Sequence, residues 1–377
     1  PLVFNYEQAD LDGDGIGNDC DVQRLYVNAA ATGSNNGLTW TNAFTTLEAA
    51  LAASDAMPSV EEVWVAQGRY VPTARTNPGD PRTATFRLRA GLSILGGFAG
   101  GETEADQADP RTRRVILSGD VLNNDGANFA NTSDNVYSVA ICETNGTIDG
   151  LVFTQGNASG TNPSVGGGVH IASSAAHFLR CEFIANQGGP NSGGGVYAGF
   201  VGSQVFEHCR FLGNRVAGSG AGARINGGSP MFLSCLFVGN AATGAGAGGG
   251  AVATFSALPT FINCTAVANS STDLTGGLHI DGGAAYTAGI FNTIAYFNTD
   301  SNGANTGTLA QIRGHNGSTV GVAYSCVQGG HAGPNISADP LLATLAGADG
   351  MIGTTDDAPA PAQGSPAIDA GANTYAA

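Results

Sequence analysis

The stretch that decides the fold contains two motifs, Gly193-Gly194-Gly195-Val196-Tyr197-Ala198 and Cys209-Arg210-Phe211-Leu212-Gly213-Asn214, and both recur along the chain. The glycine-led motif returns in segments 166–171, 220–225, 248–253 and 275–280, and the cysteine-led motif in segments 181–186, 235–240 and 264–269. The third residues of the glycine-led motifs are 27 or 28 residues apart, at Gly168, Gly195, Gly222, Gly250 and Gly277. Each period therefore holds two strand-like segments.

A period near 27 residues without helical spacing predicts an all-β fold, a parallel β-helix whose successive coils stack about 4.8 Å apart. Helical repeats are excluded because the glycines would break a helix in every period. Residues two apart on a strand share a face, so equivalent residues should form stacks. We expect an inward cysteine stack, an inward phenylalanine stack and an asparagine ladder at the following bend, made respectively of Cys181, Cys209, Cys235 and Cys264, of Phe183, Phe211 and Phe237, and of Asn186, Asn214, Asn240 and Asn269.

We expect four regions: a calcium-binding loop segment at residues 1–23, an N-terminal cap with the first coils at 24–121, the β-helix repeats at 122–335, and an irregular C-terminal coil or tail at 336–377. Within the cap we expect strands at 24–28, 63–66 and 93–96 and one short helix at 43–54. A cap is expected because the open apolar end of a solenoid must be covered.

Several phrases resemble secreted bacterial right-handed parallel β-helix proteins of the choice-of-anchor type, namely segments 25–28, 63–70, 96–103, 338–341 and 364–371. The tetrapeptides at 183–186, 211–214 and 237–240 resemble the Phe-x-x-Asn repeats of polymorphic outer-membrane-protein adhesins. The resemblance implies a right-handed parallel β-helix, with the N-terminal cap and its short helix, and a secreted or cell-surface location. It implies little about activity, because a fold does not determine a function.

Segment 10–21 carries the sharpest chemical motif. Counting Asp10 as position 1, oxygen donors fall at positions 1, 3, 5, 7, 9 and 12, with Gly15 at the turn, and this spacing suits Ca²⁺. The expected ligands are Asp10, Asp12, Asp14, the carbonyl of Ile16, Asn18 and Asp21. The segment resembles a single thrombospondin type 3 repeat. The acidic clusters at 120–125 and at Asp349, Asp356 and Asp357 are expected to be solvated turns.

The composition limits the chemistry and the binding partners of the protein. All 14 basic residues of the 377 are arginine, which excludes lysine-based covalent chemistry, and the formal charge of −16 disfavours nucleic acids and anionic membranes. No apolar run is long enough to span a membrane. The cysteine stack has two interpretations: parallel Cβ atoms about 4.8 Å apart exceed the roughly 3.8 Å of a disulfide, so buried free thiols are favoured over bridges.

A catalytic site on the repeats would have to form in one of two outward-facing columns of residues. One is expected to contain His170, Tyr197, Arg224, Val252 and His279, and the other Glu182, Arg210, Leu236, Thr265 and Thr293. Neither places two carboxylates on adjacent coils, Arg210 is expected to pair with Glu182, and Arg224 is expected to be the only arginine beside an aromatic ring. Tyr197 with its neighbours could line a shallow sugar-binding groove.

These patterns favour an extracellular or cell-surface structural or adhesive protein, such as a self-assembling subunit of a filament or surface layer. Its expected partners are further copies of itself and surface glycans. A polysaccharide lyase or hydrolase and a carbohydrate-binding module remain the alternatives. Catalysis is disfavoured because a hydrolase needs paired carboxylates, although the late coils hold Arg313 and His315.

The calcium loop gives a direct prediction. Removal of Ca²⁺ by a chelator should expose segment 10–21 to proteases while the β-helix stays folded, because the core depends on apolar stacking instead. Limited proteolysis followed by mass spectrometry measures this, with the cleavage of the repeats as the internal control. Equal cleavage of segment 10–21 with and without chelator would contradict the site.

Overall fold

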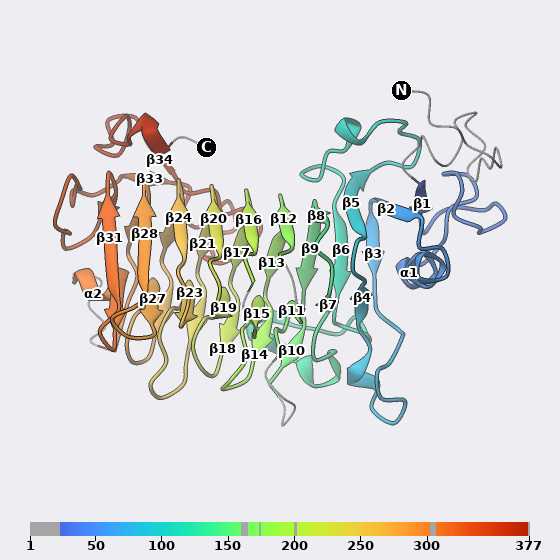
Figure 1. Ribbon diagram of the computed structural model, residues 1–377, viewed down its shortest axis with the longest axis horizontal. Coiled ribbons are helices and arrows are strands. Elements are labelled where there is room, and N and C mark those ends of the chain that lie inside the picture. The colour runs from blue at the N-terminus through green and yellow to red at the C-terminus, as the bar shows by residue number, and fades with distance from the viewer. Residues whose placement is uncertain (1–22, 160–164, 173–174, 200–201, 302–306, 376–377) are drawn as a thin grey trace.

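The computed structural model describes residues 23–159, 165–172, 175–199, 202–301 and 307–375. These residues form a right-handed parallel β-helix in which each coil contributes one strand to each of several parallel sheets (Figure 1). The predicted fold class is therefore confirmed. The calcium-loop residues 10–21 lie outside the described part of the chain.

The two largest sheets run the length of the rod. The ten-stranded sheet comprises β1 (Gln23–Val27), β2 (Val60–Ala66), β5 (Ser93–Phe98), β8 (Thr147–Asp149), β12 (His177–Leu179), β16 (Val205–Glu207), β20 (Met231–Leu233), β24 (Thr260–Ile262), β28 (Thr287–Phe291) and β31 (Thr319–Ala323). The nine-stranded sheet comprises β3 (Gly68–Tyr70), β6 (Val115–Ser118), β9 (Leu151–Thr154), β13 (Glu182–Ile184), β17 (Arg210–Leu212), β21 (Leu236–Val238), β25 (Thr265–Val267), β29 (Ile294–Tyr296) and β32 (Cys326–Val327).

The remaining elements complete the coils and the two ends. The eight-stranded sheet comprises β4 (Phe86–Leu88), β7 (Ala140–Cys142), β11 (Val169–Ile171), β15 (Val196–Ala198), β19 (Ala223–Asn226), β23 (Val252–Phe255), β27 (Leu278–Asp281) and β30 (Ile312–His315). The five-stranded sheet comprises β10 (Asn157–Ala158), β14 (Gln187–Gly188), β18 (Arg215–Val216), β22 (Ala241–Ala242) and β26 (Ser270–Ser271). Outside them lie the antiparallel pair β33 (Leu342–Ala343) and β34 (Ala360–Pro361), and the helices α1 (Leu47–Ala56) and α2 (Thr308–Gln311).

The inward stacks are present as predicted. The rings of Phe183, Phe211 and Phe237 stack with centroids 4.7 Å apart. A second stack, which the repeat analysis missed, joins rings at 4.8–5.2 Å and consists of Phe178, Phe206, Phe232 and Phe261. The six cysteines in the described residues are all buried free thiols, as favoured above. In the predicted column each thiol lies 3.2 Å from a carbonyl oxygen of the preceding coil.

The asparagine ladder is confirmed and is longer than predicted. Asn214 donates its Nδ2 hydrogens to Asn240 Oδ1 at 2.9 Å and to the carbonyl of Phe183 at 2.8 Å. The chain of side-chain amides continues through Asn269 and Asn298 to Gln311. The left-handed residue of each bend is not the ladder asparagine but the residue before it, for example Gly213 with φ 56°.

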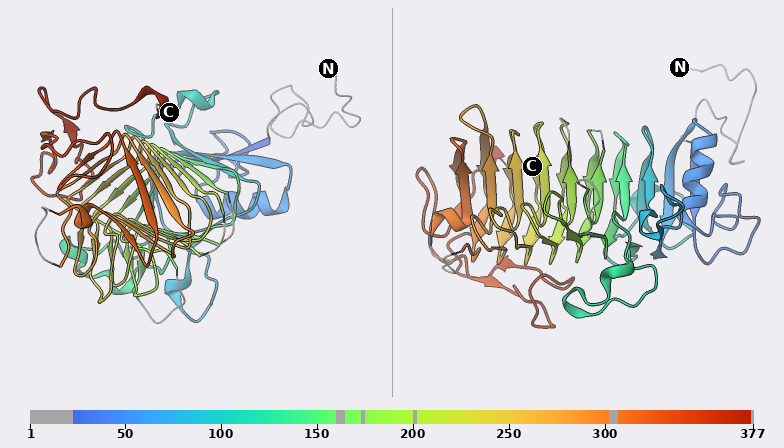
Figure 2. Two further views of the ribbon diagram at one scale, coloured as in Figure 1. Left: turned by 60° about the vertical axis from the view of Figure 1, so that its left-hand side comes forward. Right: turned by 90° about the horizontal axis from the view of Figure 1, so that it is seen from below.

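The N-terminal cap covers one end of the core (Figure 2). Helix α1 begins after Thr46, whose hydroxyl accepts a hydrogen bond from the backbone N–H of Ala49, so it starts later than residue 43. Leu47, Ala50 and Leu51 of α1 join the main hydrophobic core. The helix therefore shields the apolar edge that the first coil would otherwise leave open.

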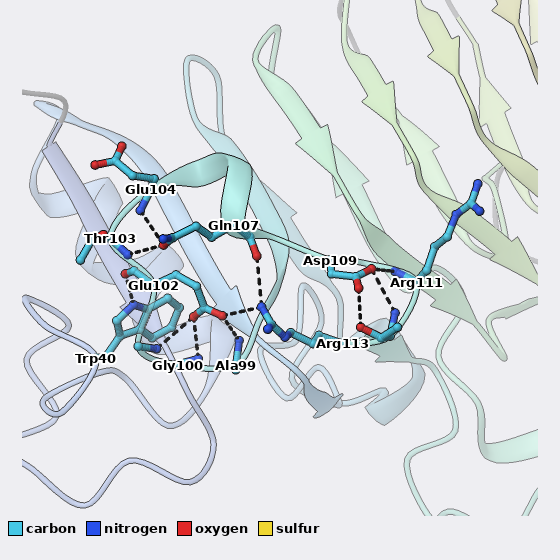
Figure 3. Close-up of polar contacts among 12 residues, drawn as sticks. Trp40, Ala99, Gly100, Glu102, Thr103, Glu104, Gln107, Asp109, Arg111 and Arg113 are labelled. Carbon is cyan, nitrogen blue, oxygen red and sulfur yellow. Dashed lines mark hydrogen bonds and ion pairs between the residues drawn. The ribbon is translucent and has the colours of Figure 1, made fainter.

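A turn in the cap is organised by one carboxylate (Figure 3). Glu102 accepts hydrogen bonds from the backbone N–H groups of Ala99, Gly100 and Gly101 and pairs with Arg113 at 2.7 Å. Burial raises the pKa of Glu102, but these backbone hydrogen bonds outweigh burial and lower the pKa to about 2.

The C-terminal segment consists mostly of turns and bends and lies along the side of the β-helix. Its apolar residues cover an outward apolar column of the nine-stranded sheet, namely Ile184, Leu212, Val238, Val267 and Tyr296. Gly353 packs against the left-handed bends at Gly213 and Gly239, where an added Cβ atom would approach it to 2.5–2.8 Å. Glycine at these two bends therefore makes room for the C-terminal segment.

Replacing Asn214 by leucine tests the ladder. The change leaves buried amide and backbone groups on both neighbouring coils without partners, so we expect a loss of about 2–5 kcal/mol in the free energy of unfolding. Thermal and denaturant unfolding measure it. Asn191→Leu at an exposed turn is the matched control and should change little. Equal stability of the two variants would show that the ladder does not stabilise the coils.

Replacing Glu102 by glutamine tests the cap turn. The folded pKa is depressed, so the stabilisation by the charged carboxylate is present above the unfolded pKa near 4.5 and is lost as pH falls toward 2. We expect Glu102→Gln to be about 1–2 kcal/mol less stable at pH 7, with a difference that shrinks on acidification. Melting curves from pH 7 to pH 2 measure it, with exposed Glu61→Gln as the control. A difference independent of pH would contradict the role of the charge.

Candidate functional site

The outer face of the nine-stranded sheet is occupied by the protein itself. Glu182 pairs with Arg210 at 2.7 Å, as predicted, and also contacts Arg114. Arg210 in turn donates to the carbonyl of Thr355 in the C-terminal segment at 3.0 Å. The predicted column was wrong at its end, where Ile294 rather than Thr293 pairs with Thr265. Thr293 continues the cysteine column instead, because its hydroxyl accepts the backbone N–H of Cys264.

The outer face of the eight-stranded sheet carries two outward columns. The first consists of Arg87, Ile141, His170, Tyr197, Arg224, Ala253, His279 and Arg313. The predicted member Val252 was wrong, because it pairs with Ala223 and Leu278 and points into the core. The second column includes Asn226, Phe255, Asp281 and His315.

Arg224 is the unusual cation of this face. Its guanidinium lies 4.6 Å from the ring centre of Phe255, and no carboxylate in the described residues pairs with it. Its Nε is buried without a hydrogen-bond partner, and burial lowers the pKa of its guanidinium. Beside it, Asn226 donates to the Tyr197 hydroxyl at 3.3 Å. An unpaired, half-buried cation costs free energy, so this position suits a negatively charged ligand.

Arg224 is not the only arginine beside an aromatic ring, which corrects the prediction. Arg24 lies over Trp64 at 4.5 Å and Arg82 over Tyr137 at 4.3 Å. Arg82 is already occupied, because it also donates to the carbonyls of Asn135 and Asn157.

Three ionisable side chains meet at the late end of the same face. His279 and Asp281 lie two residues apart on β27, and His315 is the register partner of Asp281 on β30. His315 Nδ1 lies 3.1 Å from Asp281 Oδ2, and the ring centroids of His279 and His315 are 5.2 Å apart. Candidate ligand atoms from all three residues lie within 4.8 Å of one another. From the sequence, His279 and Asp281 share a strand face, but His315 was not brought to them because the register of β30 was not known.

The charge states within this cluster follow from burial and hydrogen bonding. Burial lowers the pKa of His279 to about 4, with smaller contributions in the same direction from His315 and Arg313, so its imidazole is neutral at pH 7. Burial raises the pKa of Asp281, but hydrogen bonds from His315 and Asn316 outweigh burial and lower the pKa below its usual value. The cluster therefore presents a carboxylate at Asp281 and a neutral imidazole at His279.

The acidic clusters form hydrogen-bonded turns. Asp120 is buried, which we did not expect of a solvated turn, and it accepts the backbone N–H groups of Asn124 and Asp125. Asp357 is likewise buried and accepts the N–H groups of Gly353 and Thr354, whereas Asp356 accepts those of Ala348 and Asp349 near the surface. In the described strand registers no carboxylate is the partner of another carboxylate.

An open hollow of about 590 Å³ lies over the five-stranded sheet and is lined by amides, hydroxyls and arginines, including Asn131, Asn157, Gln187 and Arg215. Arg215 is exposed. This hollow is the competing location for a polar ligand.

Comparison with solved structures finds the same general architecture at low similarity. The pectate lyase Pel9A aligns at 12% identity and a TM-score of 0.45, covering 89% of this chain and 88% of that one. A pectin methylesterase from Aspergillus niger aligns at 13% and 0.42, over 85% and 93% of the two chains. A rhamnogalacturonan lyase aligns at 15% and 0.36, over 73% and 69%. These values carry no information about activity.

The sequence matches no protein-family model and no curated protein significantly. Within the described ranges, no helix combines the length and the apolar character needed to cross a bilayer.

Proposed function

We propose that the protein binds an acidic polysaccharide along the outer face of the eight-stranded sheet. This develops the carbohydrate-binding alternative of the sequence analysis. The observation that carries the proposal is Arg224, a half-buried guanidinium held on Phe255 with no carboxylate partner in the described residues. A sugar carboxylate would supply the missing partner through charge-assisted hydrogen bonds.

The arrangement of neighbouring side chains supports a linear ligand. Equivalent residues of successive coils follow one another along the rod, so the first outward column presents His170, Tyr197 and Arg224 in a row. Tyr197 and Phe255 add aromatic surface and Asn226 adds an amide, a combination typical of sites that bind small polar ligands. A chain of acidic sugars can contact several of these groups at once.

The net charge of −16 does not prevent such binding. At physiological ionic strength, exposed charges beyond about 8 Å are largely screened, so the local row of side chains decides the interaction. We expect binding to weaken as salt is added, because the contact between Arg224 and the ligand is ionic.

We further propose that this binding serves an extracellular or cell-surface protein with an adhesive role. The β-helix presents an extended face, and its buried thiols are compatible with export. Calcium binding by segment 10–21 and end-to-end assembly with further copies stay predictions from the sequence.

Binding of polygalacturonate tests the proposal, measured by calorimetry and by affinity electrophoresis against a neutral glucan. We expect the wild type to bind the acidic polymer and not the neutral glucan. Arg224→Gln should weaken it about tenfold or more, because a hydrogen bond to a charged group contributes about 1.5–3 kcal/mol.

Arg215→Gln in the hollow over the five-stranded sheet is the matched control and should leave binding unchanged. Loss of binding in Arg215→Gln with none in Arg224→Gln would move the site to that hollow and overturn the proposal. Equal affinity for the acidic and neutral polymers would also contradict it.

A further inference from the structure

We infer that His279, Asp281 and His315 form a binding site for a divalent transition-metal ion of the Zn²⁺ type. The site is separate from the proposed polysaccharide contact at Arg224 and does not depend on it. Its basis is the register of two adjacent coils, which brings three good ligands to one face.

The strand geometry delivers the ligands together. His279 and Asp281 project from the same face of β27 because they are two residues apart, and His315 follows Asp281 on the next coil. Two ligands therefore come from one strand and the third from its hydrogen-bonded neighbour. Such an arrangement places three donors on one side of an ion and leaves its other positions open.

The distance between two of the donors suits an ion of this size. Zn²⁺ bonds to imidazole nitrogen and carboxylate oxygen at about 2.0–2.2 Å, so neighbouring donors around a tetrahedral ion lie roughly 3.3 Å apart. His315 Nδ1 and Asp281 Oδ2 are 3.1 Å apart, close to that spacing. Imidazole nitrogen with carboxylate oxygen also favours Zn²⁺ and related metals over Ca²⁺, which prefers oxygen ligands alone.

Surrounding groups fix the orientation of the ligands. Asn316 donates to both carboxylate oxygens of Asp281, at 2.9 and 3.1 Å. The His279 ring is buried against Gly248, where an added Cβ atom would lie 2.8 Å from the ring, and its Nδ1 is 3.5 Å from the Thr275 hydroxyl. Partners of this kind hold metal ligands in place and tune their affinity.

One neighbour opposes the ion. Arg313 is the register partner of His279, and its Nη1 lies 3.4 Å from the carbonyl of Leu274. Its positive charge repels a cation, so removing that charge should strengthen metal binding. Tighter metal binding after removal of the Arg313 charge therefore indicates an ion at this position. A simple hydrogen bond between His315 and Asp281 predicts no such change.

The test uses the full chain without a histidine tag, stripped of metal and kept in excess Ca²⁺ to occupy oxygen-only sites such as segment 10–21. Calorimetric titration should show one Zn²⁺ ion bound per chain. Bound Co²⁺ should show the visible absorption of an ion with a low coordination number. Asp281→Asn and His315→Gln should each weaken binding at least tenfold. Arg313→Gln should bind several-fold more tightly.

His177→Gln is the matched control, because His177 pairs with Glu207 at 3.0 Å but belongs to no group of three ligand atoms within 4.8 Å among the described residues, although His208 lies 3.9 Å from Glu207. This variant should bind as the wild type does. Circular dichroism and melting curves confirm that each variant is folded. If Asp281→Asn or His315→Gln does not fold, the wild-type Co²⁺ spectrum and the tighter binding of Arg313→Gln decide the matter. Absence of stoichiometric binding, or binding lost in His177→Gln but kept in His315→Gln, would overturn the inference.

Discussion

Backbone pairing between coils requires each residue to lie against its equivalent in the next coil, and the rest of the structure depends on this constraint. A residue that stacks well on itself is favoured in every repeat, which explains the columns of phenylalanine, cysteine and asparagine. The asparagine ladder is the most demanding case. Each amide must both donate to and accept from its neighbours, so one wrong side chain leaves two coils with unsatisfied groups.

The same constraint sets how much of the fold the sequence reveals. Columns of identical residues were predicted correctly because identity marks their register. The prediction failed at Val252, where the glycine-led motif is displaced by one residue from the true register. A shift of one residue turns a strand over, so it exchanged an inward valine for an outward alanine, Ala253. The inward apolar column is therefore a better guide to register than glycines in the turns.

The candidate sites were harder to predict because they consist of different residues rather than repeated ones. Arg224 was identified as outward, but the sequence does not reveal that the ring beneath it belongs to Phe255 on the next coil. The cluster of His279, Asp281 and His315 depends on the pairing of β27 with β30. The turns before these two strands differ, so the repeated motif does not reveal their register. Its signal in the sequence was a histidine two residues before an aspartate, with another histidine on the following strand.

The C-terminal segment also affects how the rod bears force. Gly353 rests on the bends at Gly213 and Gly239, and Arg210 donates to the carbonyl of Thr355, so the segment is attached to the middle coils as well as to the late ones, where the Tyr375 ring stacks on Phe291. Tension applied through this segment is consequently shared among β17, β28 and β32, because the segment contacts all three strands. The final coil therefore does not carry alone the load that would peel a solenoid open from its end, because several coils resist it together.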